Sequence, residues 1–324
     1  RPRAALLGVA LGALALLLGE RGPADLVGLR SLLGGIPLAV VLPWRSWVTP
    51  TDRVALAPAV PAAAPDIVLI VHESLSARRW APWDPRAPVT ALDAFLRAHG
   101  DHAVWLPLAA PAAPSTAVSL PSLLTGLEPD ASAHDLSRAP LLWQEAAALG
   151  YQTALLSPQD YDWAGFPRFF LGRDAPQVHR VATDFPGAPR VNDHGVEDRR
   201  VVAAAAELLA SGRRPQLLVL QLNATHGPCY APGFDNTGLA HGDMDGRGGP
   251  GPRCAAAIAY VAELTAELLR QLERLGRLEQ TLVIGTADHG ESFDPSRPTR
   301  LESFYEDTLN VPLWLHLPQA FAHE

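Results

Sequence analysis

The chain contains no lysine, one methionine and only two cysteines among its 324 residues. All 26 of its basic side chains are therefore arginines, a bias of the whole composition that makes pairs such as Arg78 and Arg79 weak evidence for an anion site. The formal net charge of −8 and the lack of a basic stripe argue against nucleic acid as a partner. Cys229 and Cys254 do not form the CxxC pair of a zinc motif. They are either one disulfide, which requires an oxidising compartment, or two unrelated buried thiols.

Apolar runs dominate the first 48 residues. Residues 4–19 carry no charge, but this run is shorter than the roughly 20 residues that span a bilayer. The run over 32–44 is interrupted by glycine and proline and bordered by Trp44 and Trp47, as is typical of an interfacial segment. Because the sequence begins with Arg and not Met, we expect a piece of a longer protein. Residues 1–48 are expected to form a membrane-spanning or interfacial segment, with the basic start in the cytoplasm and the remainder of the chain outside.

Residues 49–65 are rich in Pro and Ala and predict a linker. Continuous apolar runs then alternate with helical patterns, two of which end at Gly150 and Gly276. This alternation predicts an α/β fold over 66–324, a doubly wound and mainly parallel sheet sandwiched by helices and truncated at its C-terminus. The expected strands are 67–71, 104–110, 151–157, 216–224, 281–290 and 311–318, and the expected helices are 140–150, 196–212 and 254–276.

Three of the expected strands end in residues that can bind a metal or move a proton. Glu73 follows the first strand, His226 follows a middle one, and Asp288 with His289 follows a late one. In a doubly wound fold such strand ends share one edge of the sheet, where ligands bind. Asp288 and His289 can reach one ion only where the strand has ended and the chain turns, which Gly290 permits. Carboxylate and imidazole ligands suit Zn²⁺ or Mn²⁺, and a hydroxyl bound beside them becomes a nucleophile near neutral pH.

The stretch "PSTAVSLPSLLTG" (114–126) offers five hydroxyl side chains, any of which is a candidate for that role. Taken alone, it is more typical of a turn or a helix start, where hydroxyls cap backbone groups.

The motifs "IVLIVHES", "STAVSLPSLLTG", "THGP" and "TLVIGTADHGES", in this order, resemble the alkaline phosphatase superfamily, and most of all its membrane-bound sulfatase-like phosphoethanolamine transferases. In sulfatases the nucleophile lies at a fixed distance before a Leu-Leu-Thr-Gly run, and in the transferases it opens a Thr-Ala-x-Ser-x-Pro run. Both patterns give Thr116. The resemblance implies that His226 binds the substrate or a second metal and that Ser119 steadies the phosphate or caps the helix. It also implies a metal, Zn²⁺ with Mn²⁺ or Mg²⁺ as alternatives, held by Glu73, Thr116, Asp288 and His289.

The expected function is metal-dependent transfer of a phosphoethanolamine-type group from a phospholipid to a lipid or glycan acceptor, through a phospho-threonine intermediate. The resemblance implies an inner-membrane protein with its catalytic domain on the periplasmic side, where we expect Cys229 and Cys254 to form a disulfide. One alternative is a phosphatase, a sulfatase-like hydrolase or a phosphoglycerol transferase with the same metal site. Another is an inactive member that binds lipid or glycan. It rests on two departures from the family pattern: "FDPSRPTRLESFYEDTLNVP" contains no histidine, and the helix matching Asn-Ala-Ile-x-Tyr-x-Asp lacks both Asn and Asp.

Overall fold

The computed structural model describes residues 64–172, 174–192, 195–211, 214–234, 251–292 and 303–321. The expected membrane segment over 1–48 and nearly all of the expected linker lie outside these residues. Within the described ranges, no helix is both long enough and apolar enough to cross a membrane.

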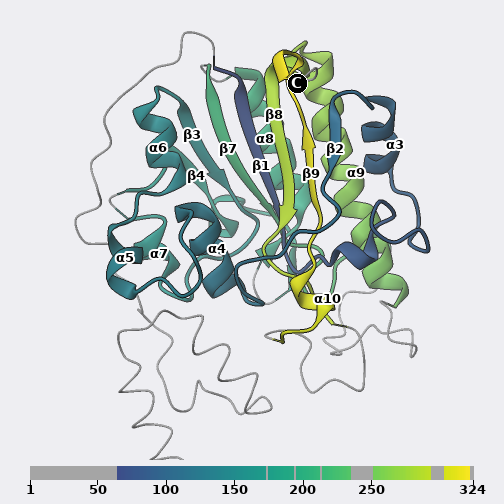
Figure 1. Cartoon of the computed structure of the whole chain (residues 1–324), viewed down its shortest axis with the longest axis horizontal. Helices are drawn as coiled ribbons and strands as arrows, with labels where there is room; N and C mark the ends of the chain where they lie inside the picture. Colours follow the sequence, from purple (N-terminus) through teal and green to yellow (C-terminus); the bar gives the residue numbers. More distant parts are fainter. Residues whose placement is uncertain are drawn as a thin grey trace, which may run out of the picture.

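A seven-stranded sheet in the order β2-β9-β8-β1-β7-β3-β4 forms the centre of the fold (Figure 1). Its central strands β8, β1, β7 and β3 are paired in parallel, and β4 continues this arrangement, whereas β9 runs antiparallel to both β8 and β2. The mainly parallel α/β sheet predicted from the sequence is thus confirmed. The strands are β1 (Asp66–His72), β2 (Ala103–Trp105), β3 (Gln152–Leu156), β4 (Val178–Arg180), β7 (Gln216–Leu222), β8 (Thr281–Ala287) and β9 (Leu313–His316), with β5 (Arg190–Asn192) and β6 (Gly195–Val196) forming a separate hairpin.

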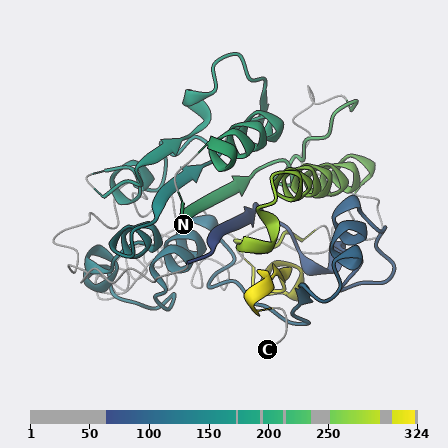
Figure 2. The same cartoon turned by 90° about the horizontal axis from the view of Figure 1, so that it is seen from above.

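Helices cover both faces of this sheet (Figure 2). Helices α3, α8 and α9 pack on one face, and α4, α6 and α7 pack on the other. Gly150 and Gly276 both adopt positive φ just beyond helices, as a glycine helix stop requires. The helices are α3 (Ala91–Ala98), α4 (Thr116–Thr125), α5 (Ala133–Arg138), α6 (Leu142–Ala148), α7 (Phe166–Phe169), α8 (Asp198–Ser211), α9 (Pro252–Arg274) and α10 (Glu306–Leu309); short 3-10 helices are Ala77–Arg79, Ala182–Asp184, Leu278–Gln280 and Gln319–Phe321.

The apolar run of β1 serves two hydrophobic cores because alternate side chains of a strand point to opposite faces. Val68 and Ile70 join the core beneath α3, α8 and α9, whereas Leu69 and Val71 join the core beneath α4, α6 and α7. Burial on both faces explains why the run is continuous and not alternating.

The edge of the sheet next to β9 differs from the prediction. A buried strand was expected over 104–110, but β2 spans only Ala103–Trp105 and its middle residue is exposed. One further hydrogen bond, from Leu106 N to Leu313 O, extends the pairing before Pro107, which has no N–H to donate. The expectation of a doubly buried strand there is wrong because β2 is an edge strand. The sequence also gave no signal for β4 at the opposite edge.

Candidate metal centre

The register of the central strands brings three polar strand ends to the same level. His72, the last residue of β1, pairs with Leu222 of β7 on one side and with Ala287 of β8 on the other. The residues that directly follow these three strands are therefore Glu73, Asn223 and Asp288. Figure 1 shows this end of the sheet beside α4 and α10.

Glu73, Asp288 and His289 form a compact buried cluster at this edge. One potential ligand atom from each residue lies within 4.8 Å of the other two, and all three side chains are buried. His289 Nε2 lies 3.4 Å from Glu73 Oε1 and 3.7 Å from Asp288 Oδ2. The structure thus brings together three of the residues that the sequence proposed as metal ligands.

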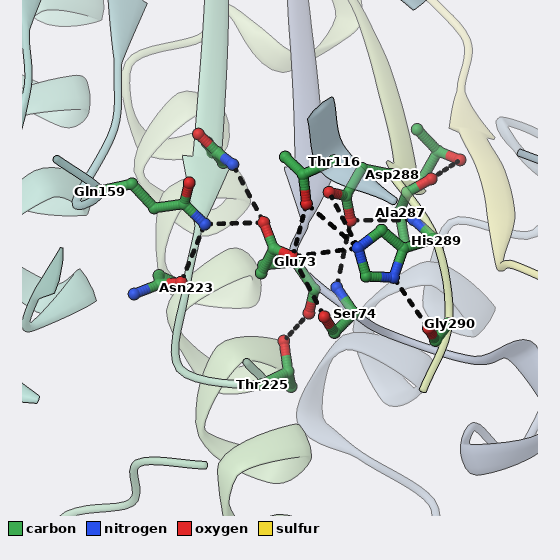
Figure 3. A network of polar contacts seen from close by, with 12 residues as sticks. Glu73, Ser74, Thr116, Gln159, Asn223, Thr225, Ala287, Asp288, His289 and Gly290 are labelled. Atoms are coloured by element: carbon green, nitrogen blue, oxygen red, sulfur yellow. Dashed lines mark hydrogen bonds and ion pairs between the residues drawn. The ribbon is translucent and has the colours of Figure 1, made fainter. Parts of the chain in front are cut away.

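Helix α4 adds a hydroxyl to the cluster. Thr116 is the first residue of this helix and is buried. Its Oγ1 donates a hydrogen bond of 3.0 Å to Glu73 Oε1 and lies 3.1 Å from His289 Nε2 (Figure 3). Ser115, its neighbour, occupies the N-cap position but makes no side-chain capping bond.

The imidazole of His289 is held with Nε2 facing the cluster. Its Nδ1 lies 2.8 Å from the carbonyl oxygen of Gly290, which can only accept, so Nδ1 carries the proton and Nε2 of the neutral ring has a free lone pair. Gly290 was expected to allow a turn, but the structure gives a different reason for glycine. A Cβ at this position would lie 2.0 Å from the carbonyl oxygen of Asp307.

These atoms fit a divalent cation. Glu73 Oε1, Asp288 Oδ2, Thr116 Oγ1 and His289 Nε2 all offer lone pairs toward one another. Among the described residues, no hydrogen-bond partner reaches the buried Asp288 Oδ2. Buried carboxylates without donors are costly, and carboxylate, imidazole and hydroxyl groups are ligands that zinc accepts. The donor set can therefore hold a metal ion.

The pKa values within the cluster reflect its concentrated charge. Burial favours the neutral form of Glu73, but the nearby His289 and His226 outweigh it and lower the pKa of this carboxyl, and a hydrogen bond from Gln159 acts in the same direction. Burial, reinforced by the negative charge of Glu73, raises the pKa of Asp288 to about 7. Burial opposes protonation of His289, but the two carboxylates prevail and raise its pKa. A bound cation would compete with these protons.

Two glutamines that sequence reasoning missed hold the other oxygen of Glu73. Gln159 Nε2 donates to Glu73 Oε2 at 2.7 Å, and Gln221 Nε2 donates to the same atom at 3.3 Å. Gln159 follows β3 and Gln221 lies within β7, so neither stands in a motif that the resemblance covers. No sequence signal marks them, because glutamine at a strand end is ordinary.

Ser74 and Thr225 also hold Glu73 and Asp288 in place. Ser74 adopts a left-handed conformation with φ of 57°, which is unusual for a residue other than glycine. Its N–H donates to Asp288 Oδ1 at 3.1 Å, and its hydroxyl donates to Glu73 Oε1 at 3.0 Å. Thr225 donates to the carbonyl oxygen of Glu73 at 2.6 Å and ties the loop after β7 to the site.

The other residues named from the sequence lie around this centre. His226 is half-buried in the loop after β7, close enough for its charge to lower the pKa of Glu73. Ser119 lies inside α4, one turn after Thr116, so it does not cap the helix, and its buried hydroxyl has no hydrogen-bond partner among the described residues. Cys229 and Cys254 form a disulfide that joins this loop to α9.

The Sulfatase family model matches residues 65–324. The chain belongs to the Sulfatase family. This family lies in the alkaline phosphatase superfamily, as the resemblance implied. A search of curated proteins gave no match.

Several solved structures have a similar fold. One is the integral membrane lipooligosaccharide phosphoethanolamine transferase A from Neisseria meningitidis, 18% identical with a TM-score of 0.64, covering 84% of this Sulfatase-family chain and 52% of that chain. A second is the C-terminal periplasmic domain of EcEptC from Escherichia coli in complex with zinc, 18% identical with a TM-score of 0.63. The match covers 83% of the present chain and 79% of that domain. A third is the lipoteichoic acid synthase LtaP from Listeria monocytogenes, 14% identical with a TM-score of 0.60. The match covers 79% of the present chain and 66% of the synthase chain. The present chain thus spans about half the length of the Neisseria transferase, and at these identities the likeness concerns the fold.

Proposed function

We propose that this Sulfatase-family protein is a zinc-dependent transferase that moves a phosphoethanolamine-type group from a phospholipid to a lipid or glycan acceptor, with Thr116 as its nucleophile. The observation that carries the proposal is the convergence of the Thr116 hydroxyl with Glu73, Asp288 and His289 at the start of α4. One of the similar structures described above is of a phosphoethanolamine transferase, and another, of EcEptC, is a complex with zinc.

The proposed reaction has two displacements at phosphorus. When bound, zinc would lower the pKa of the Thr116 hydroxyl and neutralise charge on the phosphate. In the first step Thr116 Oγ1 bonds to phosphorus, the bond from phosphorus to the diacylglycerol oxygen breaks, and the leaving oxygen takes up a proton equivalent to the one that Thr116 lost. In the second step an acceptor hydroxyl displaces Oγ1, and the proton returns to Thr116.

Other residues of the chain support this chemistry. Helix α4 begins at Thr116, and the positive end of a helix dipole favours a phosphate bound there. The half-buried His226 is proposed to bind the phosphate. The buried hydroxyl of Ser119, which has no hydrogen-bond partner within the part of the chain that the structure describes, is proposed to steady it. We further propose that residues 1–48 anchor the domain in the inner membrane on its periplasmic side, connected by the 49–65 linker.

The test has a metal arm and a donor arm. Zinc should co-purify with the wild-type protein and fall in Asp288→Ala, His289→Ala and Glu73→Ala; equal occupancy in all three would refute the metal site. In the donor arm the protein is incubated with phosphatidylethanolamine, phosphatidylglycerol or a soluble phosphate or sulfate monoester, and the intact mass is measured. A phosphoethanolamine adduct mapped to Thr116 supports the proposal, and an adduct on Ser115 or Ser119 contradicts it.

The donor arm also separates the alternatives. A phosphoglycerol adduct identifies a phosphoglycerol transferase, which one similar structure, the lipoteichoic acid synthase, makes a specific alternative. Turnover of the soluble esters without transfer identifies a hydrolase. Zinc binding without any adduct or turnover favours the inactive member over the enzymes.

A further inference from the structure

The two oxygens of Glu73 face different halves of the site. Oε1 lies toward Thr116 and His289, with distances of 3.0 and 3.4 Å. Oε2 lies toward the amides of Gln159 and Gln221 (Figure 3 shows Gln159 on the side of Glu73 away from His289). Both glutamines are about 1% exposed, so water does not compete for these bonds.

The orientation of each amide is fixed by further contacts. Gln159 Nε2 also donates to Asn223 Oδ1 at 3.0 Å, and its own backbone N–H donates to Ser157 Oγ at 3.0 Å. An ionised carboxylate only accepts hydrogen bonds, so the amide must present its nitrogen, not its oxygen, to Glu73.

Gln221 is oriented in the same manner from its other end. Its Oε1 accepts a hydrogen bond of 2.8 Å from Ser157 Oγ and another of 2.8 Å from Tyr161 OH. With the oxygen engaged by two hydroxyls, the NH₂ group points at Glu73 Oε2. The amide pair is thus anchored by Ser157 and Tyr161, from the segment that follows β3, and by Asn223, just after β7.

We propose that Gln159, assisted by Gln221, is a positioning residue of the metal centre. Its amide occupies Glu73 Oε2, so that Glu73 binds the metal through Oε1 alone. This rests on the metal site of the proposed function. A carboxylate held by one oxygen suits the low coordination number of zinc, whereas a carboxylate with both oxygens free suits cations of higher coordination such as Mn²⁺. Partners that orient a ligand typically contribute 10–100-fold in metal affinity.

The direct test is the zinc affinity of Gln159→Leu, measured by competition with a chromogenic chelator and repeated with Mn²⁺. We expect zinc to bind about 10–100-fold more weakly and the preference for zinc over manganese to shrink. Gln221→Leu, whose bond to Glu73 is longer, should have the same effect in smaller measure and replaces Gln159→Leu if that variant does not fold.

The matched control is Gln216→Leu. Gln216 is buried on the same strand as Gln221 but at the opposite end, beside Asp66 and Arg277. Its loss should lower stability and leave the zinc affinity within about twofold of wild type. The proposal is overturned if folded Gln159→Leu binds zinc as tightly as wild type, or if Gln216→Leu loses as much affinity. Because affinity is measured without a donor, failure of phosphoethanolamine transfer leaves this test intact, whereas a wild-type protein that binds no zinc refutes both proposals.

Discussion

Removal of the disulfide between Cys229 and Cys254 should destabilise the protein by an amount that follows from its position. The two cysteines are 25 residues apart, and both are buried in a small cluster with Ala231 and Ala257 that is separate from the two main cores. Restriction of the unfolded chain by a loop of this length contributes about 3.5 kcal/mol at 25 °C. Because the main cores do not depend on this cluster, the fold should survive.

The assay is urea unfolding of the wild-type protein, of the reduced protein and of the double variant Cys229→Ser/Cys254→Ser. Reduced protein and double variant should each lose about 3–4 kcal/mol of unfolding free energy relative to the oxidised protein. Thiol titration of the denatured, unreduced protein should find no free thiol. Two free thiols, or unfolding curves that coincide before and after reduction, would refute the reasoning and remove the argument for an oxidising compartment.

Three further predictions concern the nucleophile, a buried acid and a buried ion pair. Thr116→Ala should abolish adduct formation and Thr116→Ser should retain part of it, whereas Ser115→Ala should be mild because its side chain makes no capping bond; full activity of Thr116→Ala in the mass assay would contradict this. Burial raises the pKa of Asp198 to about 7, so the folded state keeps a proton that the unfolded state has released, and stability falls as the pH rises from about 4 to 7. Asp198→Asn carries no titrating group at this position. In urea unfolding, the unfolding free energy of the variant minus that of the wild type should therefore rise by about 3 kcal/mol between pH 5 and pH 8, and a difference that does not change with pH would refute the argument. Asp66→Ala should cost about 3–5 kcal/mol, because the buried Arg277 guanidinium, whose Nη2 lies 2.7 Å from the carboxylate, loses this counter-ion and keeps the neutral Gln216 Oε1 as an acceptor; a loss below about 1 kcal/mol in the same assay would contradict this.

The sequence predicted those parts of the molecule that depend on local pattern. Continuous apolar runs predicted the buried central strands. The residues that follow two of them, Glu73 after β1 and Asp288 with His289 after β8, were predicted to be neighbours because parallel strand ends share an edge. The edge strands were predicted poorly, since β4 has only three residues and β2 is both short and half-exposed. The apolar run over 104–110 is continuous and so predicted too long a strand, whereas the three residues of β4 are too few to stand out from the sequence.

What could not be predicted is the set of partners that make the cluster work. Gln159 acts because β3 lies next to β7, which lies next to β1, and this order of strands is a tertiary fact that no local pattern contains. The position of Ser74 depends on a positive φ that its residue type does not suggest. The role of Gly290 depends on the close approach of Asp307, which is a neighbour in space but lies well beyond Gly290 in the sequence.

The central position of β1 explains why one carboxylate can serve two purposes. Strand β8 on one side supplies Asp288 and His289, which are potential metal ligands, and β7 with β3 on the other side supplies amide donors. Glu73, at the end of the strand between them, has one oxygen for each side. A glutamate on an edge strand would have a neighbouring strand on one side only and would lack either ligands or donors. The strand order therefore puts the amides of Gln159, which follows β3, and of Gln221, on β7, within reach of Glu73. Substitutions of these two residues should act on the proposed metal site through Glu73.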